Sequence, residues 1–180
     1  MILEKHLPLV RASTNDPEAL REWVLAHHDD IFRFMKHLTR HHEAAEDLAQ
    51  QTFINAYQSL KRFRNESSMR TWLHRIAFRE YIAWRRKRRL TLPLDVLSGR
   101  HDHRMSEIES EADLLRALHQ LPAVQREVFL LFEVQQLSVD EVAEVAGLKS
   151  GTVKSHLHFA RKQLRSLLGD ASQEAEHEAE

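Results

Sequence analysis

Residues 137–165 read LSVDEVAEVAGLKSGTVKSHLHFARKQLR and contain the signals of two short helices joined by a tight turn. Ser138 and Glu141 form a capping-box pattern at the start of the first helix. Gly147 can adopt the left-handed backbone conformation that ends a helix, and Ser150 can cap the helix that follows. The stretch therefore predicts a helix-turn-helix.

The second helix of this pair has one apolar and one basic side. Val153, Leu157, Ala160, Leu164 and Leu168 recur at helical spacing and are expected to face inward. Residues 149–165 contain five Lys or Arg and no acid. The outward side then carries Thr152, Lys154, Ser155, His158, Arg161, Lys162 and Arg165. Such a helix can place its N-terminal residues against base edges in the DNA major groove. A purely structural helical hairpin is the alternative, and it gives the basic side no role.

A second basic helix is predicted over residues 69–89, which read MRTWLHRIAFREYIAWRRKRR. The net charge of the chain is only −1, yet residues 61–89 hold eleven Lys or Arg against two acids. One side is expected to pack and comprises Met69, Trp72, Leu73, Ile76, Ala77, Ala83 and Trp84. The other side is expected to be exposed and comprises Thr71, His74, Arg75, Phe78, Ile82, Arg85 and Arg89. Arginines mixed with apolar side chains suit a nucleic-acid backbone and unstacked bases, although a merely solvated basic side is the alternative.

Composition favours an all-α fold. The 180 residues include four glycines, four prolines and no cysteine, and no stretch shows sustained β-alternation. No apolar run approaches the roughly 20 residues that span a bilayer, and no signal peptide is evident, so we expect a cytoplasmic protein without membrane insertion. The sequence shows neither a nucleophile paired with its base nor a phosphate-binding glycine loop. We therefore expect no enzymatic activity and no cofactor.

Breaks in the helical pattern divide the chain into two small helical domains joined by a flexible linker. Asp16 and Pro17 mark the start of a helix that runs to about residue 39, and a second helix is expected from about 43 to 60. Ser67 or Ser68 can cap the basic helix. The predicted divisions are a first domain at 1–92, a linker at 93–112, a second domain at 113–169 and an acidic, disordered tail at 170–180.

The thirteen histidines raise a different possibility, because His37 and His41 are spaced for one side of a helix and could bind zinc. A metal-binding or scaffold protein would explain the histidines and little else. No third ligand is evident beside the pair, so we expect no metal site. A dimeric helix-turn-helix repressor or activator is another alternative, but it leaves the basic helix 69–89 unexplained.

Five segments, in order, resemble a known family: AAEDLAQQTFINAYQSLKRF, SSMRTWLHRIA, RRKRR, LHQLPAVQREVFLL and the helix-turn-helix stretch. They are similar to bacterial sigma factors of the extracytoplasmic-function (ECF) type, in the sigma-70 family, and the resemblance spans about residues 18–168. It implies that the first domain is sigma region 2 and the second is region 4. It also implies a non-enzymatic initiation factor that binds core RNA polymerase, recognises and melts promoter DNA, and is controlled by an anti-sigma factor.

The resemblance also implies three sets of site residues. Core polymerase would be contacted by Asp47, Gln50, Gln51 and Phe53. The minus-ten element would be bound and melted by Arg62, Phe63, Asn65, Ser67, Ser68, Arg75, Phe78, Arg79, Arg85 and Arg89. The minus-thirty-five element would be read by Ser150, Thr152, Lys154, Ser155, His158, Arg161, Lys162 and Arg165. The chain departs from the family pattern at Gln51, Arg79 and Ala83, where Glu, Asn and Asp are frequent, so the family's minus-ten preference does not carry over.

Overall fold

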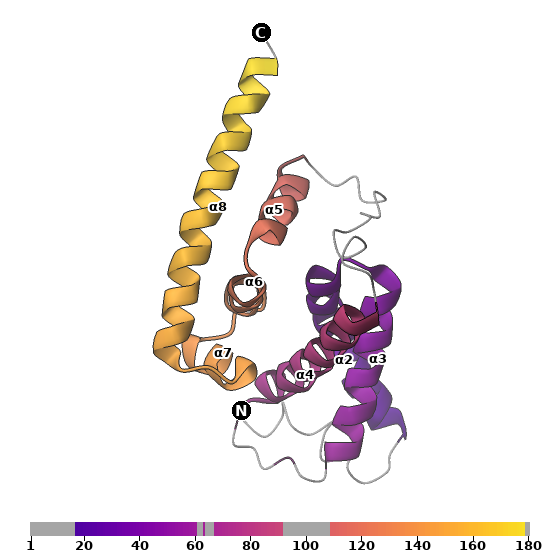
Figure 1. Cartoon of the computed structure of the whole chain (residues 1–180). Helices are drawn as coiled ribbons and strands as arrows, with labels where there is room; N and C mark the ends of the chain where they lie inside the picture. The colour runs from indigo at the N-terminus through magenta and orange to yellow at the C-terminus, as the bar shows by residue number, and fades with distance from the viewer. Residues whose placement is uncertain (1–16, 61–62, 64–66, 92–108, 179–180) are drawn as a thin grey trace. The chain divides into compact units, whose positions relative to one another are not determined.

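The computed structural model describes residues 17–60, 63, 67–91 and 109–178, all of them in helices or short connections (Figure 1). No strand occurs in these ranges, which confirms the predicted all-α class. The chain forms two compact units that divide between residues 97 and 98. Most of the predicted linker lies outside the described residues.

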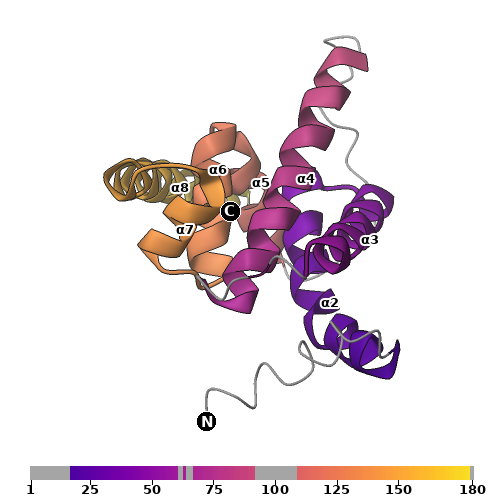
Figure 2. The same cartoon turned by 90° about the horizontal axis from the view of Figure 1, so that it is seen from below.

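The first unit contains the helices α2 (Pro17–Thr39), α3 (His42–Ser59) and α4 (Met69–Thr91), and each packs against the other two (Figures 1 and 2). Pro17 begins α2 as predicted. Arg40 has a φ of 57° and turns the chain between α2 and α3. Ser68 caps α4, because its Oγ accepts a hydrogen bond from the backbone N–H of Thr71 at 3.0 Å.

Large side chains from all three helices fill the core of this unit. Trp23, Phe34, Leu73 and Tyr81 are each at most 2% exposed. The Trp23 ring meets the ring of Phe53 edge-on, at 5.6 Å between centroids.

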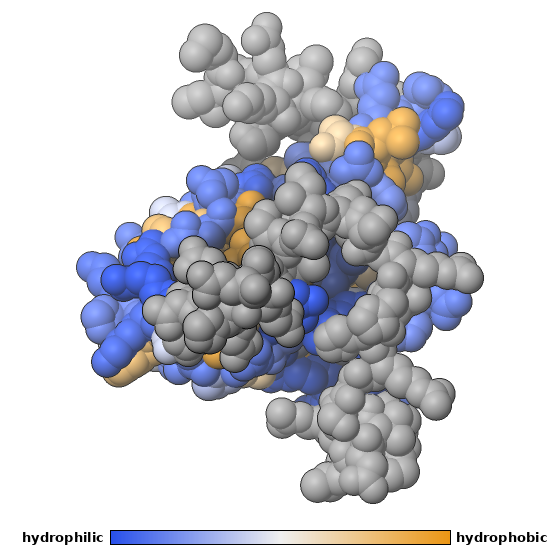
Figure 3. Space-filling model, turned by 90° about the horizontal axis from the view of Figure 1, so that it is seen from above, coloured by the Kyte–Doolittle hydropathy of each residue, from blue (hydrophilic) through white to orange (hydrophobic). Residues whose placement is uncertain are grey.

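On the face seen in Figure 3, hydrophilic side chains cover most of the coloured surface and apolar ones form small separate areas.

The buried side of α4 is wider than the sequence predicts. Thr71, His74 and Phe78 were expected to face solvent, but they are 0%, 0% and 7% exposed. Ala83, expected to pack, is exposed instead. The reason is that α4 packs against two helices rather than one, so its buried stripe extends through His74, Phe78 and Tyr81.

The second unit contains α5 (Glu109–Gln120), α6 (Ala123–Phe129), the π-helical turn η3 (Leu130–Val134), α7 (Val139–Ala146) and α8 (Ser150–Glu178). Helices α5, α6 and α7 all pack against α8. The predicted inward row of α8 is confirmed for four of its five members, which are at most 5% exposed: Val153, Leu157, Ala160 and Leu164. The fifth, Leu168, is half-buried.

The turn between α7 and α8 has the predicted helix-turn-helix chemistry. Ser138 N donates to Glu141 Oε2 at 2.9 Å, and Glu141 N donates to Ser138 Oγ at 3.3 Å, which completes the capping box. Gly147 ends α7 with a φ of 68°, in the left-handed region. Ser150 is the first residue of α8 rather than the cap before it. Its hydroxyl donates to Asp140 Oδ1 at 2.7 Å and so joins the two helices.

Helix α8 continues to Glu178, into the segment 170–180 that was predicted as an acidic, disordered tail. Ala, Glu and Gln dominate this segment and are strong helix formers. Extending a helix that is already nucleated needs no new nucleus, so these propensities suffice.

We predict opposite effects for alanine at two glycines only four positions apart. Gly147→Ala should destabilise the second unit by about 1 kcal/mol, because alanine is strained at a positive φ. Gly151→Ala should be neutral or stabilising by up to about 1 kcal/mol, because an added Cβ there meets nothing within 4 Å and alanine favours helix. Hydrogen–deuterium exchange of α7 and α8 amides in the full chain measures both. Equal effects at the two positions would contradict the turn assignment.

Candidate nucleic-acid and protein interfaces

The outward side of α8 is mostly polar and basic, and we call it the α8 face. All seven side chains predicted to face outward from the helix are exposed: Thr152, Lys154, Ser155, His158, Arg161, Lys162 and Arg165. The eighth candidate, Ser150, is half-buried and engaged with Asp140. Packing of α5, α6 and α7 on the opposite side holds this surface in place.

Arg161 differs from the other basic residues of the α8 face, because it is held by a neighbouring element. Its Nε and Nη2 donate to Glu133 Oε1 at 3.0 and 2.6 Å, and its guanidinium lies 5.5 Å from the centre of the Phe132 ring. Glu133 and Phe132 both belong to η3. The pair is partly exposed, so water screens the attraction, but the contacts fix the direction of the arginine.

The exposed side of α4 carries the second basic surface, which we call the α4 face. Arg79 is exposed, and Arg75 and Arg85 are half-buried. The guanidinium of Arg85 lies 5.5 Å from the Tyr81 ring centre, and that of Arg88 lies 5.2 Å from the Trp84 ring centre. Arg88 was missed in the sequence, although its spacing of four from Trp84 is a signal for this contact. The Arg89 side chain lies outside the described part of the structure.

The segment before α4 is described only in part. Phe63 is half-buried, and its ring centroid lies 4.9 Å from that of Trp72. Ser67 Oγ is shielded from solvent and has no hydrogen-bond partner within the described residues. Arg62 and Asn65 lie outside those residues. Phe78 is 7% exposed and packs in the core, so its predicted contact with DNA bases is corrected.

The exposed side of α3 is a third surface, acidic and amide-rich. Asp47, Gln50 and Gln51 are exposed as predicted. Phe53 is only 8% exposed, because its ring packs on Trp23 in the core, so its predicted polymerase contact is corrected.

Two residues that the sequence did not single out complete the α3 surface. Ile54 and Tyr57 are 43% and 39% exposed, and helical spacing places them on the same side as Asp47 and Gln50. The spacing of Ile54 from Asp47 and Gln50 was the available signal.

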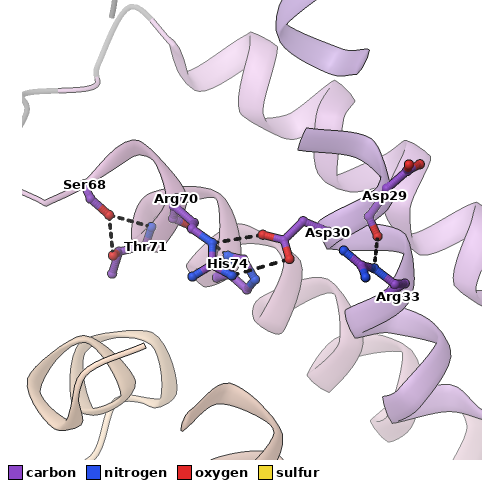
Figure 4. Close-up of polar contacts among 7 residues, drawn as sticks. All are labelled: Asp29, Asp30, Arg33, Ser68, Arg70, Thr71 and His74. Carbon is purple, nitrogen blue, oxygen red and sulfur yellow. Dashed lines mark hydrogen bonds and ion pairs between the residues drawn. The ribbon is translucent and has the colours of Figure 1, made fainter. Parts of the chain in front are cut away.

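Helix α4 is tied to α2 by a polar cluster shown in Figure 4. Arg70 Nε donates to Asp30 Oδ2 at 2.9 Å, and His74 Nδ1 donates to the backbone carbonyl of Arg70 at 2.9 Å. His27 belongs to the same cluster and is half-buried. Burial lowers the pKa of His27 below its usual value, helped by nearby His74 and Arg70 and opposed by Asp30.

Neither a metal site nor a membrane span emerges from the described residues. No group of three His, Asp or Glu side chains there could hold a metal ion, and this includes the surroundings of His37 and His41. None of the helices searched has the length and apolar character needed to cross a bilayer.

Two family models match the chain, one in each unit. The model of sigma-70 region 2 matches residues 23–91, and that of sigma-70 region 4 matches residues 111–164. ECF RNA polymerase sigma factor SigE of Mycolicibacterium smegmatis is 31% identical, over 93% of this chain and 69% of that protein. ECF RNA polymerase sigma factor SigM of Mycobacterium tuberculosis is 32% identical, over 86% of this chain and 79% of that protein.

Solved structures agree with this grouping. The sigma factor RpoE of Bartonella quintana, crystallised with the anti-sigma factor NepR, is 28% identical and superposes with a TM-score of 0.70, over 83% of this chain and 96% of that one. CnrH, in complex with the cytosolic domain of CnrY, shares the fold at 23% identity and the same TM-score. The chain belongs to the ECF group of sigma-70 family RNA polymerase sigma factors.

We predict that His27 makes the first unit less stable in mild acid. The pKa of His27 is lowered in the folded state, so the unfolded chain binds a proton first as the pH falls through about 6.5, and stability is lost from there down to the folded pKa. Urea unfolding followed by tryptophan fluorescence at pH 7.5 and pH 5.5 measures this loss, since all three tryptophans lie in the first unit. His27→Gln should lose less stability than wild type between these pH values. An identical loss in the two proteins would contradict the assignment.

Proposed function

We propose that this sigma factor binds core polymerase through α3, acts on the minus-ten element through α4 and the segment before it, and reads the minus-thirty-five element through α8. The observation that carries the proposal is the presence of two basic helix faces on two separate compact units. Each face is backed by a buried apolar side, so it is displayed in a fixed direction. We assign residues 1–92 to region 2 and residues 113–169 to region 4, with 93–112 as the linker between them.

The α4 face is suited to a DNA strand that has been opened. Phosphates attract Arg75, Arg79 and Arg85 without regard to sequence, and this attraction weakens as salt rises. Extruding a base costs a few kcal/mol, which a pocket and nearby phosphate contacts can offset. Phe63, resting on Trp72, and the shielded hydroxyl of Ser67 lie where such a pocket would form. Because the Ser68 hydroxyl caps α4, we assign Ser68 to the stability of this helix rather than to direct contact with the base.

The α8 face is suited to duplex DNA. Thr152, Lys154 and Ser155 lie in the first turns of the helix, where recognition helices reach base edges. Arg161 is already aimed by Glu133 and Phe132, so DNA would meet a preset guanidinium rather than a mobile one. Lys162 and Arg165 would contact phosphates further along the helix.

The α3 surface is suited to protein rather than DNA. Asp47 would repel phosphates, whereas amides and the partly exposed Ile54 and Tyr57 are typical of a protein interface. We therefore assign core polymerase to Asp47, Gln50, Gln51, Ile54 and Tyr57.

Control by an anti-sigma factor is part of the proposal. Its support is the RpoE–NepR complex, whose sigma factor shares the fold and 28% of the sequence. We also propose that the protein works in the cytoplasm, where promoters and polymerase are. It acts by binding, without making or breaking a covalent bond, so the energy for melting comes from the contacts with the opened strand.

The function is tested by adding the purified chain to core polymerase on a library of bacterial promoter fragments. The account predicts transcripts that start at particular promoters only when this chain is present. A helix-turn-helix repressor would bind DNA but give no such transcripts, and a metal-binding scaffold would give neither result. Absence of chain-dependent transcripts would overturn the proposed function.

We predict that Asp47→Arg weakens binding to core polymerase by about tenfold or more, because it reverses the one charge among the five residues assigned to this contact. Glu22→Arg is the matched control, since it makes the same charge reversal at an exposed site on α2. Affinity for fluorescently labelled core polymerase, with helical content checked by circular dichroism, measures both. If the two variants bind equally well, the docking surface is misassigned.

A further inference from the structure

Phe159 is an exposed aromatic residue that the fold of the second unit does not use. Its side chain is 54% exposed, more than Leu114, Val124 or Val134 in the same unit. It meets the neighbouring His158 ring edge-on at 5.6 Å, and His158 is itself exposed. Because the Phe159 ring is exposed, it does not stabilise the core of this unit. An exposed aromatic side chain often marks a binding surface, so we ask which partner could cover the ring.

Phe159 lies on the α8 face rather than beside it. Residues spaced by three, four or seven share one side of a helix, and Phe159 has these spacings to Lys162, Ser155 and Thr152. All three are exposed. The residues that precede Phe159 on this side of the helix, Thr152 and Ser155, have short side chains. An added Cβ at Gly151 would meet nothing within 4 Å. The ring therefore projects from a row of low side chains.

The charge around Phe159 identifies the occupant as DNA. Residues 149–165 hold five Lys or Arg and no acid, and Glu133 on the neighbouring turn η3 is occupied by Arg161. Such a surface attracts a polyanion. Within the major groove, the apolar feature that distinguishes one base pair from another is the 5-methyl group of thymine.

We propose that Phe159 is a specificity-determining residue that reads a thymine 5-methyl group in the minus-thirty-five element. The proposal rests on the proposed role of α8 and adds the chemical group that it recognises. Lys154, Lys162 and Arg165 would supply attraction to phosphates that does not depend on sequence. The aromatic ring would supply discrimination, because only one of the four bases carries a methyl group at that edge.

The test uses holoenzyme assembled from the full chain and core polymerase, on a promoter first established by chain-dependent transcription. Each thymine of the minus-thirty-five element is replaced singly by deoxyuridine, which removes the 5-methyl group and leaves base pairing intact. Wild-type holoenzyme should bind about three- to fivefold more weakly at one or two of these positions, the amount expected for one buried methyl group.

Protein variants link this loss to the ring. Phe159→Ala should bind thymine and deoxyuridine promoters equally, and Phe159→Leu should keep part of the difference. Because the side chain is exposed, neither variant leaves a cavity. Val124→Ala is the matched control, an exposed apolar residue on α6, and should keep the full difference whatever its effect on overall affinity.

Three results would overturn the proposal while leaving the proposed function intact. The element could contain no thymine, wild type could ignore every methyl group, or Phe159→Ala could retain the full discrimination. The second or third result, together with a loss of binding to a protein partner in Phe159→Ala, would assign the ring to that partner instead. If no promoter depends on this chain, the proposed function itself fails before this experiment begins.

Discussion

The first unit depends on α4 burying one side against two helices while its other side keeps its charge in water. Trp72, Leu73 and Tyr81 anchor the buried side, and a fully buried side chain of this kind contributes about 1.5 to 3 kcal/mol. That stabilisation opposes the repulsion between the closely spaced arginines of the exposed side. Arg85 over Tyr81 and Arg88 over Trp84 reduce the conflict further, because each cation rests on an aromatic ring.

Polar contacts join α4 to both of the helices that it packs against. The Arg70–Asp30 ion pair joins α4 to α2, and Asn55 Nδ2 donates to Glu80 Oε1 at 2.8 Å to join α3 to α4. The contact gives the half-buried Glu80 carboxylate a hydrogen-bond donor. A helix held from two sides presents its basic face in one orientation. The proposed contact with a separated DNA strand requires such a fixed orientation, because the phosphates would have to meet the arginines in register.

Local features were predictable from the sequence, and features that depend on neighbours were not. The capping box at Ser138, the turn at Gly147 and the inward row of α8 follow from signals within a few residues. The burial of Phe78 was missed because the width of a buried stripe depends on how many helices pack against it.

The same distinction applies to the candidate sites. The α8 face was predicted nearly completely, since helical spacing alone places its residues. The contact of Arg161 with Glu133 could not be predicted, because the partner lies 28 residues earlier and on a π-helical turn with no sequence signal. Phe159 was overlooked because a phenylalanine between basic residues was not counted with either side of the helix.

The central claim is that the segment before α4 captures a base while the arginines of the α4 face hold phosphates. The most direct test compares holoenzyme binding to an intact promoter and to one with a pre-melted minus-ten region, for Phe63→Ala with Ser67→Ala and for Arg75→Gln with Arg85→Gln. Pre-melting already supplies the cost of unpairing and unstacking. It should therefore restore open-complex formation to the first pair of substitutions, while the arginine substitutions stay impaired and show a weaker salt dependence. If holoenzyme assembles normally and the bubble rescues neither pair, or both equally, the division of roles is contradicted.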